Sequence, residues 1–318
     1  MKIYDVVIVG AGPGGIASAI ECKKMGVENI VLLEKTDNIS AMIREYYKDG
    51  KRVDKDYKGQ VVTLAGHIPF SDGNKESTLD LFSKLLDENS VEIKLQHEVD
   101  NVSKKDSIFI VRTTNNVEFH AKHVIIGIGK MGKPNKPSYP LPTSLRKKIN
   151  FNVNDCVAGE EILVVGGGNS AVEYAIALNA MTKTTLNYRR KEFNRINGEN
   201  ARELEKSLQN GLISKFGIDI IAVSDKDSRL EVTFSDNSTG IFDRIVYAIG
   251  GVVPVDFLKK CGIELDSSGV AQCNEVKESN IANLFVVGDI LFKNGGSIAL
   301  AMNDAYTIAT EISKRLQK

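Results

Sequence analysis

Three glycines near the N-terminus, Gly10, Gly12 and Gly15, have the spacing G-x-G-x-x-G within the run GAGPGG. The run follows the apolar residues 4–10 and precedes an apolar stripe that stops at Gly26, an order that predicts a buried strand and then a helix. In this motif the first glycine allows a tight turn, the second lets the backbone approach a pyrophosphate, and the third lets the helix pack closely on the strand. Amides at the helix N-terminus face the negative charge. The pattern therefore predicts a dinucleotide-binding site.

A carboxylate follows in a position that suits a ribose. Residues 29–35 (NIVLLEK) predict a second strand, and Glu34 lies near its end. At this place in the motif a carboxylate accepts hydrogen bonds from ribose hydroxyls. Strand, helix, second strand and acid together favour a cofactor site over the alternative that the glycines only form a tight turn.

The same arrangement occurs again one domain length later in the chain. Residues 161–165 (EILVV) predict a buried strand, and residues 166–171 (GGGNSA) fit the variant G-x-G-x-x-A. A helix is expected over residues 170–181, and a strand over residues 184–188 (TTLNY). The sequence therefore predicts a second dinucleotide site.

The second site ends in bases where the first ends in an acid. Arg189, Arg190 and Lys191 follow the predicted strand directly. Charge-assisted hydrogen bonds contribute roughly 1.5–3 kcal/mol each, so two arginines on a 2′-phosphate would favour NADPH over NADH by roughly two to four orders of magnitude. The alternative is a solvated basic turn.

Two nucleotide sites of opposite preference in one chain suggest a flavin carrier paired with a nicotinamide donor. We therefore predict FAD at the first site, NADPH at the second, and hydride transfer from NADPH to FAD. No catalytic acid or base is predicted, because hydride transfer depends on alignment more than on proton chemistry.

The order of these elements predicts an α/β fold with two Rossmann-like, dinucleotide-binding domains. The first domain is expected to be discontinuous, with residues 1–130 and 252–318 binding FAD, and residues 131–251 are expected to form the NADPH-binding domain. Residues 130–142 hold four of the seven prolines and are the best candidate for a linker. A second crossover is expected at residues 248–254.

Several runs, in this order, resemble the low-molecular-weight thioredoxin reductase-like flavoproteins over essentially the whole chain. They are GAGPGG with Glu34, VIIGIG at 124–129, GGGNSA with Arg189 and Arg190, IVYAIGG at 245–251, and VVGD ending at Asp289. The resemblance implies a thioredoxin reductase-like fold and a homodimer. It also implies that Asp289 binds the FAD ribitol, that Val99 contacts the adenine through its backbone, and that the amides of residues 296–298 face the flavin pyrimidine.

The candidate site residues fall into two groups. Those expected to bind FAD are Gly10, Gly12, Pro13, Gly14, Gly15, Glu34, Lys35, Val99, Gly288, Asp289, Gly296, Ser297 and Ile298. Those expected to bind NADPH are Gly166, Gly168, Asn169, Ser170, Ala171, Arg189, Arg190 and Lys191. Tyr46 and Tyr47 could stack on the flavin ring, although a packed or surface role is the more common one for such residues.

The chain departs from the thioredoxin reductase pattern at two places. Tyr188 stands where the family usually has histidine, and the candidate third arginine, Arg195, comes one residue late. Thioredoxin reductases carry C-x-x-C shortly before the second glycine loop, whereas residues 147–155 contain no cysteine and Cys156 stands alone. Without two thiols the flavin cannot pass electrons to an internal disulfide.

The acceptor is therefore expected to take electrons from the flavin directly. Ferredoxin-NADP reductases of this type usually add a C-terminal extension that covers the flavin, and this sequence ends at Lys318 after its last predicted helix. Bacillithiol-disulfide reductases tend to have cysteine in the first loop, where this chain has Gly14. The chain is most similar to NADPH-dependent flavodoxin/quinone reductases. Three alternatives remain open: a ferredoxin-NADP or disulfide reductase, a flavin redox sensor, and a direct attack by Cys156 on a small disulfide.

Composition excludes other classes of function. Lys plus Arg and Asp plus Glu number 41 each, so no global field would draw the protein to nucleic acid. No apolar run reaches the roughly 18 residues of a membrane span, and the N-terminus offers no signal-peptide core, so we expect a cytoplasmic protein. The four cysteines have no metal-ligand spacing, and the four histidines are expected to be structural, so no metal site is predicted.

Overall fold

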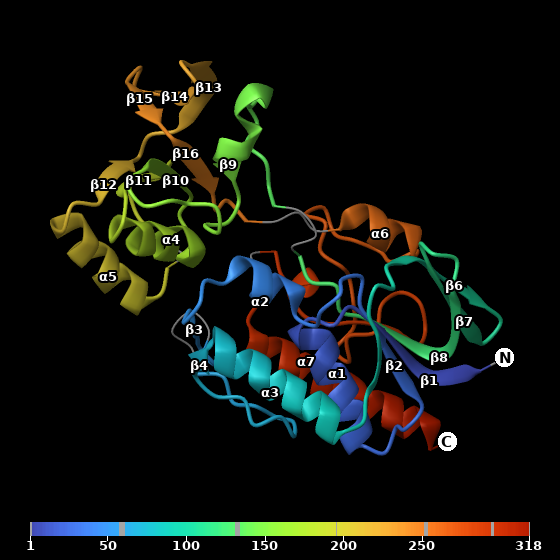
Figure 1. Cartoon of the computed structure of the whole chain (residues 1–318). Coiled ribbons are helices and arrows are strands. Elements are labelled where there is room, and N and C mark those ends of the chain that lie inside the picture. Colours follow the sequence, from blue (N-terminus) through green and yellow to red (C-terminus); the bar gives the residue numbers. More distant parts are fainter. Residues whose placement is uncertain are drawn as a thin grey trace. The chain divides into compact units, whose positions relative to one another are not determined.

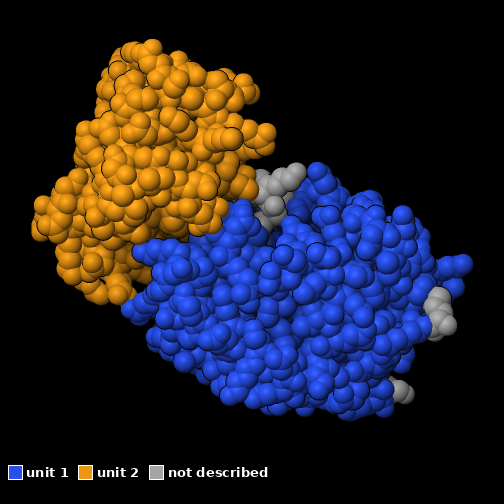
Figure 2. All heavy atoms as spheres, viewed as in Figure 1, with its two compact units in different colours: residues 1–132, 252–318 blue, residues 133–251 orange. Residues whose placement is uncertain are grey.

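The structure, a computed structural model, describes residues 2–56, 61–130, 134–194, 196–250, 254–293 and 296–317. The chain divides into two units (Figure 2). Unit 1 consists of residues 1–132 and 252–318, and unit 2 of residues 133–251. Both ends of the chain therefore belong to the same unit. Among the helices described, none is long and apolar enough to cross a membrane.

Unit 1 is built on a seven-stranded sheet whose core is parallel. The path runs β5-β2-β1-β8-β7-β6, and β17 pairs with β8. The parallel strands are β1 (Ile3–Val9), β2 (Ile30–Leu33), β5 (Glu92–Lys94), β8 (Glu118–Ile126) and β17 (Leu284–Val286). An antiparallel hairpin, β6 (Val99–Lys105) and β7 (Ile108–Thr113), extends the sheet through the first part of β8. Val9 lies opposite both Leu33 and Ile126, so three strands end at one edge.

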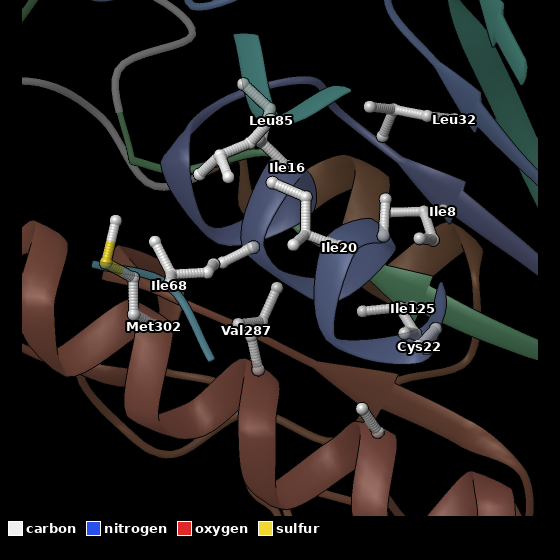
Figure 3. Packing of buried hydrophobic residues seen from close by; sticks show 14 of the residues in the cluster. Ile8, Ile16, Ile20, Cys22, Leu32, Ile68, Leu85, Ile125, Val287 and Met302 are labelled. Carbon is white, nitrogen blue, oxygen red and sulfur yellow. The ribbon is translucent and has the colours of Figure 1, made fainter. Parts of the chain in front are cut away.

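Three helices pack around one face of this sheet (Figure 1). α1 (Pro13–Lys24) contacts both α3 (Lys75–Glu88) and α7 (Ile298–Leu316). Ile16 and Ile20 of α1 are fully buried, and Figure 3 shows them beside side chains of the sheet and of α7. The first and last helices of the chain thus share a core.

The strand β1 shows how the parallel centre of the sheet is covered on both faces. Val6 and Ile8 face the core cluster of α1, whereas Val7 and Val9 belong to the cluster on the opposite face. Successive side chains of a strand point to opposite faces, so a continuous apolar run is what a sheet covered on both sides requires. Unit 1 also contains β3 (Arg52–Val53), β4 (Gly73–Asn74), α2 (Ala41–Tyr46), α6 (Val255–Lys260) and the 3-10 turn η2 (Asp289–Leu291).

Unit 2 repeats the parallel arrangement on a smaller scale. Its sheet has the order β12-β11-β10-β16-β9. The strands are β9 (Ile149–Asn150), β10 (Glu161–Val165), β11 (Lys183–Tyr188), β12 (Ile213–Phe216) and β16 (Arg244–Tyr247), all parallel. α4 (Asn169–Asn179) and α5 (Gly198–Gln209) follow β10 and β11 in the chain. The unit also contains the antiparallel strands β13 (Ile220–Lys226), β14 (Arg229–Phe234) and β15 (Thr239–Phe242), and the 3-10 helix η1 (Thr143–Lys148).

The predicted α/β fold with two glycine-loop sheets is confirmed, and most differences concern element boundaries. The strand β8 is a single element of nine residues, whose burial alternates at first and becomes continuous from His123 onward. Alternation alone therefore indicates only its first part. α3, β6 and the β13–β15 sheet were not predicted.

Candidate cofactor sites

The first glycine loop is closely packed everywhere except at its tip. Gly10 has a φ of +98°, and a Cβ there would lie 2.6 Å from the carbonyl oxygen of Gly127. A Cβ on Gly15 would lie 1.8 Å from the Gly10 oxygen. On Gly12, by contrast, the nearest atom would be 4.0 Å away. The first and third glycines therefore serve the fold, and the second leaves open space before the helix.

The two helices that follow glycine loops begin without a side-chain cap. Gly12 precedes α1 and Gly168 precedes α4, and neither start has a side-chain hydrogen bond. The other long helices are capped, α3 by Asn74, α5 by Asn197 and α7 by Ser297. Uncapped helix N-termini leave backbone amides that can bind phosphate. The starts of α1 and α4 are thus available to anionic ligands.

Glu34 lies just after β2 and is held against the first loop. Its side chain is buried, and its Oε2 accepts a hydrogen bond of 2.8 Å from the amide of Ala11. Its Oε1 accepts from the amide and hydroxyl of Thr36 at 3.0 and 2.9 Å. A carboxylate has about four acceptor positions, so Oε2 can accept one further bond. The sequence predicted a ribose ligand here and missed that Glu34 also fixes the loop.

A pocket of about 170 Å³ opens beside this carboxylate. Four of its lining residues are candidates from the sequence: Gly10, Glu34, Lys35 and Val99. The others, which were not predicted, are Val9, Leu33, His97, Glu98, Ile128, Pro254 and Phe257. Glycine backbone, buried carboxylate and apolar wall together suit the adenosine part of a dinucleotide.

The predicted ribitol ligand lies close to the first loop in the fold. The side chain of Val287, two residues before Asp289, would lie 3.3 Å from a Cβ on Gly14 at the start of α1. Gly288 has a φ of +82°, and Oδ1 of Asp289 accepts a hydrogen bond of 2.9 Å from the amide of Gly296. The structure therefore brings Asp289 together with the residues that precede α7.

One cation near Asp289 was not predicted. Lys130 follows Gly129 at the carboxyl edge of the sheet, and its Nζ donates to the carbonyl oxygen of Phe292. Burial lowers the pKa of Lys130, and the charge of Asp289 acts in the opposite direction. At the start of α7, the hydroxyl of Ser297 accepts from the amide of Leu300 at 3.2 Å.

The second glycine loop repeats the design of the first. A Cβ on Gly166 would lie 2.3 Å from the carbonyl oxygen of Ala248 and 2.9 Å from the Cβ of Ala171. On Gly168 a Cβ would meet no atom within 4 Å. Asn169 and Ser170 form the first turn of α4, and Ser170 is exposed. The open tip again lies at the uncapped helix start.

The basic segment lies at the carboxyl end of β11. Arg189, Arg190 and Lys191 are all exposed. Neither arginine forms an ion pair with any residue that the structure describes, so both guanidinium groups are available to an anion. The third candidate, Arg195, lies outside the described residues.

None of the four cysteines has an activated thiol. All are free; Cys22 and Cys261 are buried, Cys156 is half-buried and Cys273 is exposed. Burial raises the pKa of Cys156 to about 11 and that of Cys22 to about 12. The described residues include no group of three or more His, Cys, Asp or Glu side chains that could hold a metal ion.

The aromatic candidates Tyr46 and Tyr47, and the histidine His67, have structural contacts. Tyr47 packs against the core of unit 1, and the Nζ of Lys51 lies 4.0 Å from its ring centroid. Burial, followed by the nearby Glu45, raises the pKa of Tyr46. His67 illustrates the histidines: its Nδ1 lies 2.7 Å from Oε2 of the buried Glu21.

Comparison with known proteins decides the family. The profile of the pyridine nucleotide-disulphide oxidoreductases matches residues 7–288, which is most of the chain. The chain belongs to this family. It is an NADPH-dependent flavin oxidoreductase with FAD and NADPH as cofactors.

Among curated relatives of this oxidoreductase is a ferredoxin–NADP reductase of Ignicoccus hospitalis, 25% identical over 296 residues that cover 90% of each chain. A thioredoxin reductase of Helicobacter pylori is 27% identical over 338 aligned positions that cover 99% of each chain. The bacillithiol disulfide reductase of Bacillus cereus superposes with a TM-score of 0.82 at 23% identity, covering 99% of this chain and all of that one. These likenesses confirm the thioredoxin reductase-type fold.

Proposed function

We propose that unit 1 binds FAD through its first glycine loop, that unit 2 binds NADPH through its second, and that electrons then pass from the flavin to flavodoxin or a quinone without a dithiol. The observation that carries this proposal is the state of the cysteines. The chain has four, none in a C-x-x-C pair, and each thiol has a raised pKa.

The assignment of the cofactors rests on charge. Glu34 lies beside the first loop, and a carboxylate there accepts ribose hydroxyls but repels a 2′-phosphate. Arg189 and Arg190 directly follow Tyr188, which packs on the second loop, and neither has an acidic partner among the described residues. Guanidinium groups bind phosphate through paired hydrogen bonds. The two sites therefore suit FAD and NADPH respectively.

The proposed route avoids thiol chemistry for a physical reason. The thiolate is the form of cysteine that attacks a disulfide, and a raised pKa leaves little thiolate at neutral pH. Cys156 is the only cysteine in unit 2, and burial is the largest cause of its raised pKa. An internal exchange also needs a second thiol nearby, and no C-x-x-C supplies one.

FAD, when bound, accepts hydride from NADPH and can release electrons singly or in pairs. The role of this chain's residues is to bind and align the two cofactors. The first glycine loop, Glu34 and Asp289 would hold FAD, and the second glycine loop with Arg189 and Arg190 would hold NADPH. Alignment of reacting groups is the principal requirement of hydride transfer.

Ferredoxin is the second candidate acceptor. Two considerations bear on it: the Ignicoccus hospitalis relative is named a ferredoxin–NADP reductase, and a dithiol-free flavin suits any small electron-transfer protein. Flavodoxin and ferredoxin make the same demand on this chain, which is direct access to the flavin.

The experiment is a comparison of acceptors on one preparation. NADPH oxidation is followed with flavodoxin, ferredoxin, a benzoquinone, thioredoxin and a low-molecular-weight disulfide. We expect turnover with flavodoxin or the quinone, and we expect Cys156→Ser to turn over as the native enzyme does, with Cys273→Ser as the matched control. Turnover with thioredoxin or the disulfide alone, lost in Cys156→Ser, would overturn the proposal. Bound cofactors with no turnover on any acceptor would indicate a redox sensor.

A further inference from the structure

The two parts of the proposed NADPH site come from different elements of unit 2. The second glycine loop begins α4, whereas Arg189 and Arg190 follow β11. A nucleotide that uses both needs them at a fixed spacing. Direct contacts between the segments therefore bear on the choice of nucleotide.

The first contact is aromatic. Tyr188 packs on the glycine loop, since a Cβ on Gly167 would lie 2.0 Å from its Cε2. The ring centroid of Phe193 lies 4.8 Å from that of Tyr188 and 4.9 Å from that of Phe216. The amide of Gly217 donates to the carbonyl oxygens of Tyr188 and Arg190 at 2.9 and 3.1 Å. The backbone on either side of Arg189 is thus anchored.

The second contact is a set of three asparagines, Asn169, Asn197 and Asn200, which we call the asparagine bridge. Oδ1 of Asn169, in the first turn of α4, accepts from the backbone amide of Asn197 at 2.9 Å and from Nδ2 of Asn200 at 3.0 Å. Nδ2 of Asn200 also donates to Oε1 of Glu173 at 3.0 Å. The bridge therefore joins the start of α5 to the start of α4.

We propose that Asn200 is a positioning residue for the choice of NADPH over NADH. The proposal rests on the proposed role of Arg189 and Arg190 as ligands of the 2′-phosphate. The segment that carries these arginines leads to α5, and the side chain of Asn200 fixes the start of α5 against α4. Preorganisation of a binding segment lowers the entropy lost on binding. A nucleotide without a 2′-phosphate makes no use of the arginines and gains nothing from this order.

The chain offers a matched control at the other end of the same helices. Nδ2 of Asn179 donates to the carbonyl oxygen of Asn210 at 3.1 Å, which joins the C-terminal ends of α4 and α5. Asn179→Ala removes an interhelical hydrogen bond far along the helices from the glycine loop. This variant therefore measures how nucleotide affinity responds to the loss of a hydrogen bond between α4 and α5 that lies away from the nucleotide site.

The test measures binding of nucleotide fragments to the FAD-loaded enzyme by calorimetry. Asn200→Ala loses two side-chain hydrogen bonds. It keeps its backbone amide, which donates to Oδ1 of Asn197 at 2.7 Å, so the N-terminal cap of α5 is retained. We expect adenosine 2′,5′-bisphosphate to bind about 3- to 10-fold more weakly and adenosine 5′-monophosphate to change by less than about 2-fold. Asn200→Asp, which sets a carboxylate against Glu173, should show a larger loss of the bisphosphate. Asn179→Ala should leave both affinities unchanged.

Equal losses for the two fragments, or no loss for either, would overturn the role of Asn200. The double variant Arg189→Ala, Arg190→Ala separates this from a failure of the site itself. If the double variant binds the bisphosphate as the native enzyme does, the 2′-phosphate site is wrong and the role of Asn200 is wrong with it. If the double variant loses affinity while Asn200→Ala does not, only the role of Asn200 is wrong.

Discussion

Adding one methyl group at the tip of either glycine loop should block one cofactor and spare the other. At Gly12 and Gly168, which directly precede α1 and α4, a Cβ would meet no atom closer than 4.0 Å. Neither has a positive φ, since their values are −81° and −103°. Gly12→Ala and Gly168→Ala therefore require no rearrangement of the folded protein.

The expected effect on folding is small and the effect on binding is larger. Alanine is a poorer residue than glycine at a helix start, which costs about 0.5–1 kcal/mol in the free energy of unfolding. The methyl group instead occupies space that a pyrophosphate must approach, and overpacking costs roughly 1–3 kcal/mol, a factor of about 5–150 in affinity. Gly12→Ala should weaken FAD binding by about 5- to 150-fold and leave NADP⁺ binding unchanged, and Gly168→Ala should do the reverse.

The assay combines flavin titration of the apoprotein, calorimetry with NADP⁺ and chemical denaturation of the apoprotein. Gly15→Ala is the contrasting variant, because its Cβ would lie 1.8 Å from a backbone oxygen and the fold itself should fail. If Gly12→Ala retained native FAD affinity at native stability, the reasoning that its openness serves the cofactor would be refuted. Loss of both cofactors in both variants would refute the assignment of one cofactor to each loop.

Three further changes have definite expected outcomes. Asp289→Ala should release FAD on extensive dialysis, and a fully yellow protein afterwards would contradict the ribitol assignment. The double variant Arg189→Ala, Arg190→Ala should raise KM for NADPH by about 10- to 100-fold per arginine and leave kcat nearly unchanged. The preference for NADPH over NADH in kcat/KM should fall accordingly, and steady-state kinetics with both nucleotides measure it. Burial raises the pKa of Asp304, against the lowering effect of Lys277, so folding is favoured while this carboxyl is protonated and the contribution is lost as pH rises through its raised pKa. The melting temperature of Asp304→Asn minus that of the native protein should therefore rise between acidic and neutral pH. A difference that stays constant with pH would contradict a raised pKa of Asp304.

The sequence predicted those parts of the site that short-range spacing encodes. Gly10, Gly15 and Gly166 were assigned from their spacing, and the contacts that their Cβ atoms would make explain why glycine is required. Periodicity also identified β1 and β10 almost to the residue.

Other elements also carry a local signal in the sequence. The helix α3 has apolar residues at positions 79, 82, 85 and 86, a helical spacing, and begins at the capping residue Asn74. The turn between β13 and β14 contains Asp227 and Ser228, both with positive φ, which are typical turn residues.

The remaining site residues could not be found in this way because long-range packing places them. His97 and Phe257 both line the pocket beside Glu34 although they are far apart in the chain. Local pattern says nothing about which distant loop closes over a strand end. The contact of Tyr188 with Gly167 likewise depends on the register of β10 and β11.

The central claim is that this oxidoreductase moves electrons through the flavin alone. Anaerobic titration of the FAD-loaded protein with NADPH tests it most directly, with the visible absorbance of the flavin as the readout. The account predicts that one equivalent of NADPH fully reduces each flavin, before and after alkylation of the thiols, because a dithiol-free enzyme has no second two-electron group. A requirement for two equivalents that falls to one after alkylation would show a redox-active disulfide and contradict the account.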